Sequence, residues 1–360
     1  MYDRYDLMKY QRCGESGLML PLVSLGAWHN FDTFESARSL TLKAWDLGIT
    51  HIDFANNYGP PPGIAETHFG YLIKGELAAH RDELIIATKA GYRMWDGPYG
   101  EWGSKKHLFA SLHQSLKRLQ LDYVDIFYSH RYDPNTPLEE TMGALAQMIR
   151  EGKALYAGIS SYPAKAVKKA AKIMRDLCVP LIINQSSYNL LDRSIEGKVL
   201  EETQEAGLGM IVFCPLAQGL LTDRYLQGIP TDSRAASASI FLNSDRITPL
   251  LSAVLIELNT LALTRGQTLA RMSLNWILRD RRITSLLIGA SKPEQIEDCV
   301  AVQQDEPFTA EELRRIETIL AQLNPPPPEP APRIILKPIT KTTKPKSAVP
   351  KKGIAPKTSN

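Results

Sequence analysis

The sequence predicts a closed (β/α)8 barrel, on the basis of three observations. Eight short apolar segments, many of them rich in β-branched residues, alternate along the chain with amphipathic stretches. This alternation is typical of βαβ units, whose parallel strands are buried on both faces. Eight such units favour a closed barrel over an open sheet. An open sheet usually carries a Gly-rich phosphate loop after its first strand, and neither GxGxxG nor GxxxxGK[ST] occurs in this sequence.

The elements follow in order along the chain. Before the first strand, YQRCGESGLMLP predicts a small hairpin that turns at residues 14–17 and is a candidate to plug the barrel floor. Residues 104–120 predict a helix, because Leu108, Leu112, Leu116 and Leu119 recur at the spacing of a buried stripe. Residues 266–280 have a similar pattern. The eight expected strands are residues 22–28, 51–56, 84–91, 123–130, 154–161, 181–188, 209–217 and 285–291.

Two regions interrupt this rhythm. Residues 218–247 form a long insertion after the seventh strand, and long ordered loops are often functional. Residues 325–360 contain ten prolines and eight Lys or Arg, with few bulky apolar residues. Such a segment cannot bury enough apolar surface to fold alone. The sequence therefore predicts a barrel domain over residues 1–324 and a disordered basic tail over 325–360.

Charge and composition restrict the function classes. The formal net charge is +3, but the tail holds eight basic residues and one acid, which leaves 34 basic and 38 acidic residues before it. An acidic body argues against a nucleic-acid-binding domain. The four cysteines are far apart, which indicates neither a disulfide framework nor a metal site. With no signal peptide and no membrane-spanning run visible, we expect a cytoplasmic protein without a membrane partner.

The basic tail has two interpretations. It could tether the protein to an acidic partner, a nucleic acid or an anionic membrane. It could instead be a solubilising or neutral extension, which we favour because the tail has no aromatic residue for base stacking.

Candidate site residues come from the rule that barrels carry their function at the carboxyl ends of the strands. Three consecutive expected strands end in HIDFANNY, ATK and FYSH, which offer Asp53, Tyr58, Lys89 and His130. Adjacent strands lie about 4.8 Å apart, so these side chains can converge. Each alone has a structural interpretation, Tyr58 as a surface aromatic and His130 as a core histidine. Together, at successive strand ends, they favour a functional site.

These residue types point to one chemistry. A tyrosine with a pKa near 10 is a poor proton donor at neutral pH, and a nearby ammonium group would lower that pKa. Lys89 can supply the ammonium group, Asp53 can hold it charged, and His130 can orient a carbonyl oxygen. Tyr58 would then act as a general acid while a hydride attacks the carbon. Because no side chain donates a hydride, a nicotinamide cofactor is required.

Several separate segments resemble the aldo-keto reductase superfamily over roughly residues 1–324. They look closest to the branch that includes bacterial L-glyceraldehyde 3-phosphate reductases and the β subunits of voltage-gated potassium channels. The resemblance is carried by GAW, HIDFANNYG, ATKAGY, YVDIFYSHR, GISSY, NQSSYN, FCPLAQGLLTDRYLQG and LIGASKPEQIEDC.

The resemblance implies NADPH-dependent carbonyl reduction with Tyr58 as the catalytic acid, Lys89 and Asp53 as its supporting pair and His130 as the substrate-orienting residue. It places the carboxamide on Ser160, Ser161 and Gln185 and the nicotinamide ring on Phe213. Trp28 and Asp53 are also expected among the cofactor-binding residues. Without the resemblance, a Phe at position 213 in the seventh strand would more often be a core residue of the barrel than a surface for the nicotinamide ring. The backbone expected to bind the diphosphate is that of Cys214, Pro215, Leu216, Ala217, Gln218 and Gly219. Two basic residues of the long loop, Arg224 and Arg234, are expected to bind the same diphosphate. The residues expected around the adenosine 2′-phosphate are Gly289, Ser291, Lys292, Gln295 and Asp298.

The resemblance also implies substrates and assembly. Small aldehydes such as L-glyceraldehyde 3-phosphate or methylglyoxal are expected, with Trp28, Tyr58, His130 and Arg131 facing them, and a homo-oligomer is implied. The alternative function is a weakly catalytic, NADP(H)-sensing regulatory subunit. The channel β subunits carry Asn where this chain has His130, so we favour an enzyme.

Overall fold

The computed structural model describes residues 4–231, 233–236, 242 and 244–323. The chain divides after Asn324 into two units, and the first holds all the described helices and strands. The predicted tail, 325–360, lies outside the described residues.

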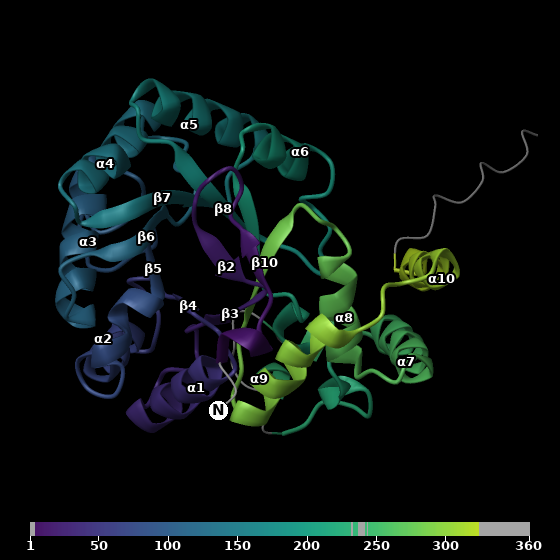
Figure 1. The fold of residues 1–360 in the computed structure, drawn as a ribbon. Coiled ribbons are helices and arrows are strands. Elements are labelled where there is room, and N and C mark those ends of the chain that lie inside the picture. The colour runs from purple at the N-terminus through teal and green to yellow at the C-terminus, as the bar shows by residue number, and fades with distance from the viewer. Residues whose placement is uncertain (1–3, 232, 237–241, 243, 324–360) are drawn as a thin grey trace, which may run out of the picture. The chain divides into compact units, whose positions relative to one another are not determined.

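Eight parallel strands close into a barrel in the order β10-β3-β4-β5-β6-β7-β8-β9, which confirms the predicted (β/α)8 fold (Figure 1). Each predicted segment contains or overlaps one strand, but β10 begins two residues earlier than expected. Ile283 and Thr284 extend the buried run, so the polar Arg281-Arg282 pair precedes the strand. The strands are β3 (Val23–Gly26), β4 (His51–Asp53), β5 (Ile85–Ala90), β6 (Val124–Ser129), β7 (Ala154–Ser160), β8 (Leu181–Ser187), β9 (Gly209–Phe213) and β10 (Ile283–Ile288).

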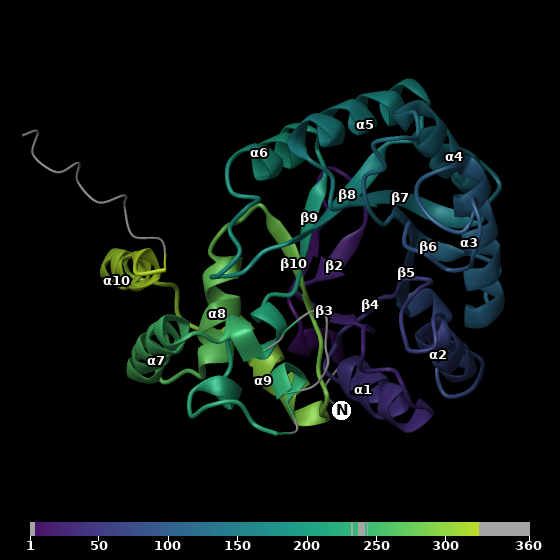
Figure 2. The same cartoon turned by 180° about the vertical axis from the view of Figure 1, so that it is seen from behind.

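Helices cover the barrel from outside, and Figure 2 shows α7 and α10 side by side beyond α8, as Figure 1 does. The predicted helix at 104–120 is α3. Ser104 caps its first turn by accepting from the His107 backbone N–H, and its leucine stripe is buried. The helices are α1 (Phe34–Asp46), α2 (Ile64–Lys74), α3 (Lys105–Leu119), α4 (Leu138–Arg150), α5 (Ala164–Asp176), α6 (Lys198–Glu205), α7 (Pro249–Thr264), α8 (Leu269–Leu278), α9 (Pro293–Val300) and α10 (Ala310–Ala321).

The predicted N-terminal hairpin closes the barrel floor. Strands β1 (Tyr10–Arg12) and β2 (Met19–Pro21) pair antiparallel. Cys13 and Leu20 are fully buried in a cluster with residues of the barrel interior, including Ile126 and Ile211. The Glu15 backbone N–H donates to the Gly207 carbonyl, just before β9, at 2.9 Å. The opposite end of the barrel, where the strands have their carboxyl ends, is left open for a site.

The long insertion after β9 is built from short 3-10 turns where the structure describes it: η3 (Ala217–Gly219), η4 (Asp223–Tyr225), η5 (Arg234–Ala236) and η6 (Ser244–Arg246). None of the described helices is both long enough and apolar enough to cross a membrane. None of the four cysteines, all of which lie within the described residues, forms a disulfide.

Candidate active site at the barrel mouth

A cavity of about 1190 Å³ opens at the carboxyl ends of the barrel strands. Asp53 comes from the end of β4, His130 follows β6, and Gln185 lies in β8. Tyr58, from the loop after β4, joins them in the same wall. These candidate side chains, chosen because they follow the ends of strands, therefore lie together in one cavity, as expected for a barrel mouth.

Lys89 lies behind this wall, not in it. Its side chain is fully buried, and its Nζ forms an ion pair with the Asp53 carboxylate and donates to the Phe54 carbonyl at 2.7 Å. The other Asp53 oxygen accepts from Gln185 Nε2 at 3.2 Å. Asp53 is therefore held from both sides, and the ammonium group has a fixed position.

Burial dominates the titration of this pair. It lowers the pKa of Lys89 and raises the pKa of Asp53, while the attraction between the two charges opposes both shifts. A charge taken out of water is costly unless it is paired, so each partner depends on the other. A single substitution in the pair would therefore leave the other charge buried without its partner.

Tyr58 lies over the ammonium group, with Lys89 Nζ 5.1 Å from the centroid of its ring. The predicted lowering of its pKa by Lys89 is wrong for this structure. Burial holds the pKa of Tyr58 well above its ordinary value, and the Asp53 carboxylate raises it further. The Lys89 charge is paired with Asp53 and does not offset the effect of burial on the phenol. The hydroxyl consequently keeps its proton at neutral pH and is a weaker acid than an ordinary tyrosine.

His130 is fixed by its backbone and by two rings. Its backbone N–H donates to the Ala90 carbonyl at 2.9 Å. Its ring makes edge contacts with the rings of Tyr92 and Tyr58, at 4.7 Å and 6.1 Å between centroids. Burial, with the charges of Lys89 and Arg131, holds the imidazole pKa well below its ordinary value. The ring is therefore neutral at physiological pH, and its buried Nδ1 has no hydrogen-bond partner.

Most of the candidate cofactor residues line the same cavity. Phe213 is half-buried there and not enclosed in the barrel core, and the Ser161 N–H donates to the Gln185 carbonyl at 2.9 Å. Ala217 and Lys292 do not line the cavity. The candidates that do are Trp28, Asp53, Ser160, Ser161, Gln185, Phe213, Cys214, Pro215, Leu216, Gln218, Gly219, Arg224, Gly289, Ser291, Gln295 and Asp298.

The start of α9 is organised by Gln295, whose side-chain oxygen accepts from the backbone N–H of Ser291 at 2.8 Å and of Lys292 at 3.3 Å. Asp298 accepts from Thr268 Oγ1 at 2.9 Å. These contacts connect α9 to the start of α8 and give this end of the cavity a defined wall.

Arg131, expected to face the substrate, does not line the cavity in this structure. Its guanidinium group pairs with Glu101 and stacks on Trp102. Arg234 begins η5, and its side chain lies outside what the structure describes.

The cavity also contains residues that the sequence did not single out. They come from the loops after β3 and β4, from the insertion and from the starts of α8 and α9, and no pattern in the sequence distinguishes them from ordinary loop or helix-start residues. The main ones are His29, Asn30, Asn57, Thr222, Asp223, Tyr225, Thr268 and Glu294.

The donor set fits a nicotinamide dinucleotide. The turn after β9 holds Cys214, Ala217 and Gln218 at positive φ, a strained conformation that non-glycine residues keep mainly at functional sites. Such turns form concave surfaces suited to phosphate groups. Within the described residues, no group of three or more His, Cys, Asp or Glu side chains could hold a metal ion.

The chain belongs to the aldo/keto reductase family, whose model matches residues 22–321. It is 52% identical over 331 residues to the L-glyceraldehyde 3-phosphate reductase of Escherichia coli strain K12, an alignment that covers 89% of this chain and 94% of that protein. It is 36% identical over 322 residues to a putative voltage-gated potassium channel subunit beta of Schizosaccharomyces pombe, covering 85% and 92%. The holo form of aldo-keto reductase AKR11C1 from Bacillus halodurans superimposes with a TM-score of 0.70 at 28% identity, covering 87% and 96%. The family and these relatives support an oxidoreductase.

Proposed function

We propose that the protein reduces small aldehydes and ketones to alcohols with NADPH, as an oxidoreductase acting on CH–OH groups, and that Tyr58 supplies the proton. The observation that carries this proposal is the buried Lys89, paired with Asp53 directly behind the cavity wall that holds Asp53, Tyr58 and His130. A fully buried Lys–Asp pair is costly to desolvate, and its position under a cavity-facing phenol supports a functional role.

Each side chain has a separate task in this reaction. The bound cofactor would supply the hydride. His130, neutral and fixed, hydrogen-bonds the carbonyl oxygen, and Tyr58 donates its proton to that oxygen as negative charge develops. Lys89 stabilises the phenolate that remains, and Asp53 holds Lys89 in place. Gln185 contacts Asp53 and so connects the proton donor to the cofactor side of the cavity.

For the cofactor, we propose that Ser160, Ser161 and Gln185 bind the carboxamide and that Phe213 stacks on the ring. The turn at 214–219, with Arg224 and Arg234, would hold the diphosphate. Ser291 and Lys292 at the start of α9 would face the 2′-phosphate with Gly289, Gln295 and Asp298 around the adenosine, which favours NADPH over NADH.

For the substrate, the E. coli relative suggests L-glyceraldehyde 3-phosphate, and methylglyoxal, with a role in its detoxification, is a second candidate of similar size. Trp28, Tyr58 and His130 would face the carbonyl compound. We propose a cytoplasmic homo-oligomer whose partners are small molecules and neither nucleic acid nor membrane.

The test is NADPH oxidation by the purified protein with L-glyceraldehyde 3-phosphate, methylglyoxal and several aromatic aldehydes. Tyr58→Phe should lower turnover by about 10² to 10⁴-fold, the usual contribution of a general acid, and leave NADPH binding intact. A Phe variant with normal turnover would remove Tyr58 from its role. Tight NADPH binding by the unaltered protein without turnover on any carbonyl would favour the regulatory-subunit alternative.

A further inference from the structure

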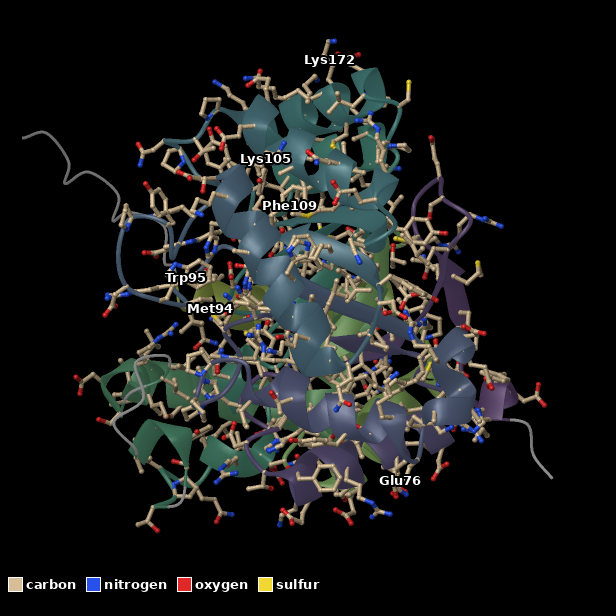
Figure 3. All side chains as sticks on the ribbon, turned by 90° about the vertical axis from the view of Figure 1, so that its left-hand side faces the viewer. Glu76, Met94, Trp95, Lys105, Phe109 and Lys172 are labelled. Atoms are coloured by element: carbon tan, nitrogen blue, oxygen red, sulfur yellow. The ribbon has the colours of Figure 1, made fainter. Side chains whose placement is uncertain are left out.

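An aromatic loop runs between β5 and α3 and forms part of the cavity wall. It carries Tyr92, Trp95, Tyr99 and Trp102, and Figure 3 shows Met94 and Trp95 of this loop near Lys105 and Phe109 at the start of α3. Tyr92 lines the cavity, although 38% of its surface is exposed. An exposed aromatic ring in a site wall keeps its position only if the loop behind it is held.

The loop is held, and at one point it is strained. The Trp102 N–H donates to the Gly91 carbonyl at 3.0 Å, and the Gly103 N–H donates to the Asp133 carboxylate at 3.0 Å. Trp102 has a φ of 75°, which a bulky side chain rarely adopts. Such strain persists where the surroundings over-determine it, which is frequent at functional sites.

Arg131 is the residue that over-determines this conformation. Its guanidinium carbon lies 3.6 Å from the Trp102 ring centroid and 4.3 Å from that of Tyr92. Its Nε donates to the Gly91 carbonyl at 3.0 Å, and its Nη2 pairs with Glu101. A planar, five-donor guanidinium group can stack and form these bonds at once, whereas an ammonium group cannot.

Tyr92 transmits this arrangement to the site. Its ring contacts the His130 imidazole edge-on at 4.7 Å, and Gly91 lies so close that a Cβ there would be 3.1 Å from His130 Cβ. The imidazole is therefore confined by the loop that Arg131 holds together.

We infer that Arg131 is a positioning residue that fixes Tyr92 against His130 and thereby sets the orientation of the carbonyl oxygen; it is not a ligand for a substrate phosphate. The inference rests on the proposed reductase function. It differs from a phosphate-binding role in a measurable way, because orientation of the carbonyl group affects every substrate, whereas a phosphate ligand affects only phosphorylated ones.

The experiment compares Arg131→Lys with the unaltered protein on glyceraldehyde and on glyceraldehyde 3-phosphate. Lysine keeps the positive charge but lacks the planar guanidinium group that stacks on Tyr92 and Trp102. We expect kcat to fall about tenfold with both substrates, because small displacements of orienting groups have effects of this size or larger, while KM and NADPH binding change little. Arg279→Lys is the matched control, since its guanidinium carbon stacks 3.7 Å from the Trp276 ring centroid and neither residue lines the cavity. It should leave kcat unchanged.

A rise in KM confined to the phosphorylated substrate, with normal kcat on glyceraldehyde, would overturn the inference in favour of a phosphate ligand. If Arg131→Lys does not fold, Glu101→Gln removes the guanidinium partner at a more exposed position and should give a smaller fall in kcat on both substrates. A crystal structure of either variant provides a readout independent of turnover, because an unmoved Tyr92 ring would also overturn the inference. Absence of turnover in the unaltered protein would instead count against the proposed function, and the Tyr92 ring would still decide the positioning role.

Discussion

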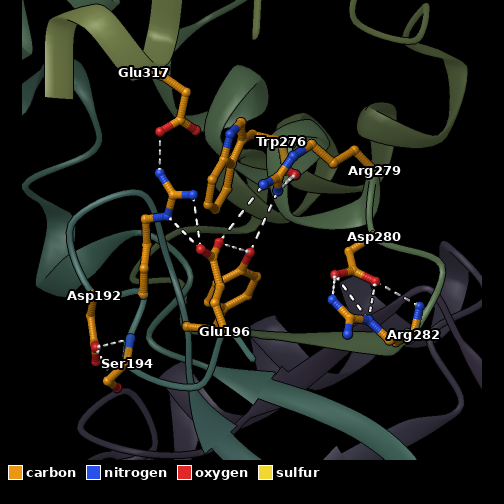
Figure 4. Close-up of polar contacts among 10 residues, drawn as sticks. Asp192, Ser194, Glu196, Trp276, Arg279, Asp280, Arg282 and Glu317 are labelled. Atoms are coloured by element: carbon orange, nitrogen blue, oxygen red, sulfur yellow. Dashed lines mark hydrogen bonds and ion pairs between the residues drawn. The ribbon is translucent and has the colours of Figure 1, made fainter. Parts of the chain in front are cut away.

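Two ion-pair regions of this molecule pair a basic side chain with a carboxylate, but the carboxylate pKa is raised in one region and lowered in the other. At the barrel mouth, the side chains of Lys89 and Asp53 are 0% and 2% exposed. On the outside, Arg193 and Glu196 are each 30% exposed and form part of the cluster in Figure 4. The comparison sets a fully buried pair beside the cavity against a partly exposed cluster that connects the segment before α6 to α10.

The outer cluster is well satisfied by hydrogen bonds. Glu196 accepts from Tyr188 Oη at 2.7 Å and from Arg193 Nε at 3.0 Å, and Arg193 also reaches Glu317 on α10 at 2.7 Å. Burial works to raise the pKa of Glu196, but the bonds from Arg193 and Tyr188 outweigh it, so the pKa is lowered. This cluster stabilises the charged state of the carboxylate.

At the barrel mouth, burial has a larger effect on the pKa values than the attraction between the two charges. The pKa of Asp53 is raised and that of Lys89 lowered, which means that the fold works against both charges. Perturbed pKa values caused by burial beside a cavity mark a candidate functional site. The difference is one of solvation, since the outer pair keeps contact with water and the inner pair has only its partner, Phe54 and Gln185.

The largest effect is therefore expected from breaking the inner pair. Lys89→Met should abolish most turnover, by about 10³-fold or more, and Asp53→Asn should be comparably damaging. The double variant should be little worse than either single one, because the residues act as a unit. Each single variant should also lose about 3–5 kcal/mol of unfolding free energy, since it leaves a buried charge unpaired.

Steady-state kinetics and urea unfolding of the three variants provide the measurement. Effects that multiply in the double variant would contradict the idea of one unit. NADPH binding is the control, since retained affinity shows that the barrel mouth is still assembled.

A medium effect is expected one layer below the pair, at His51. This fully buried histidine contacts Ser24 Oγ at 2.9 Å, and burial, with the Lys89 charge, lowers its pKa to about 3. Between the ordinary pKa of about 6.5 and that value, the unfolded chain binds a proton that the folded chain does not. This contribution to stability is therefore complete above pH 6.5 and is lost as the pH falls, by about 1.4 kcal/mol per pH unit.

His51→Gln should remove this contribution to the pH dependence. The measurement is the unfolding free energy of both proteins in urea from pH 8 to pH 4. At pH 8 their difference reports packing alone, so the change in that difference with pH is the quantity of interest. Parallel curves would show that His51 does not titrate in this way.

The sequence predicted the parts of the site that depend on backbone periodicity. Asp53, Lys89 and His130 lie at strand ends, where the barrel geometry alone brings them together. The stacking of Arg131 between Tyr92 and Trp102 could not be predicted, because it requires the left-handed turn at Trp102 and contacts between residues about thirty to forty positions apart. The raised pKa of Tyr58 was missed for a related reason, since burial depends on how the loop after β4 closes over the phenol.

The smallest effect is expected at the outer cluster. Glu196→Gln keeps the shape of the side chain and removes one charge from a partly exposed pair, so it should change the unfolding free energy by only about 1 kcal/mol. Turnover and NADPH binding should be unchanged, because Arg193, Tyr188 and Glu317 lie on the outside of the barrel and do not line the cavity. Urea unfolding and kinetics under the same conditions as for Asp53→Asn make the two carboxylates directly comparable. If Glu196→Gln reduced kcat as Asp53→Asn does, the two regions would be energetically coupled, and the contrast between a functional and a structural ion pair would fail.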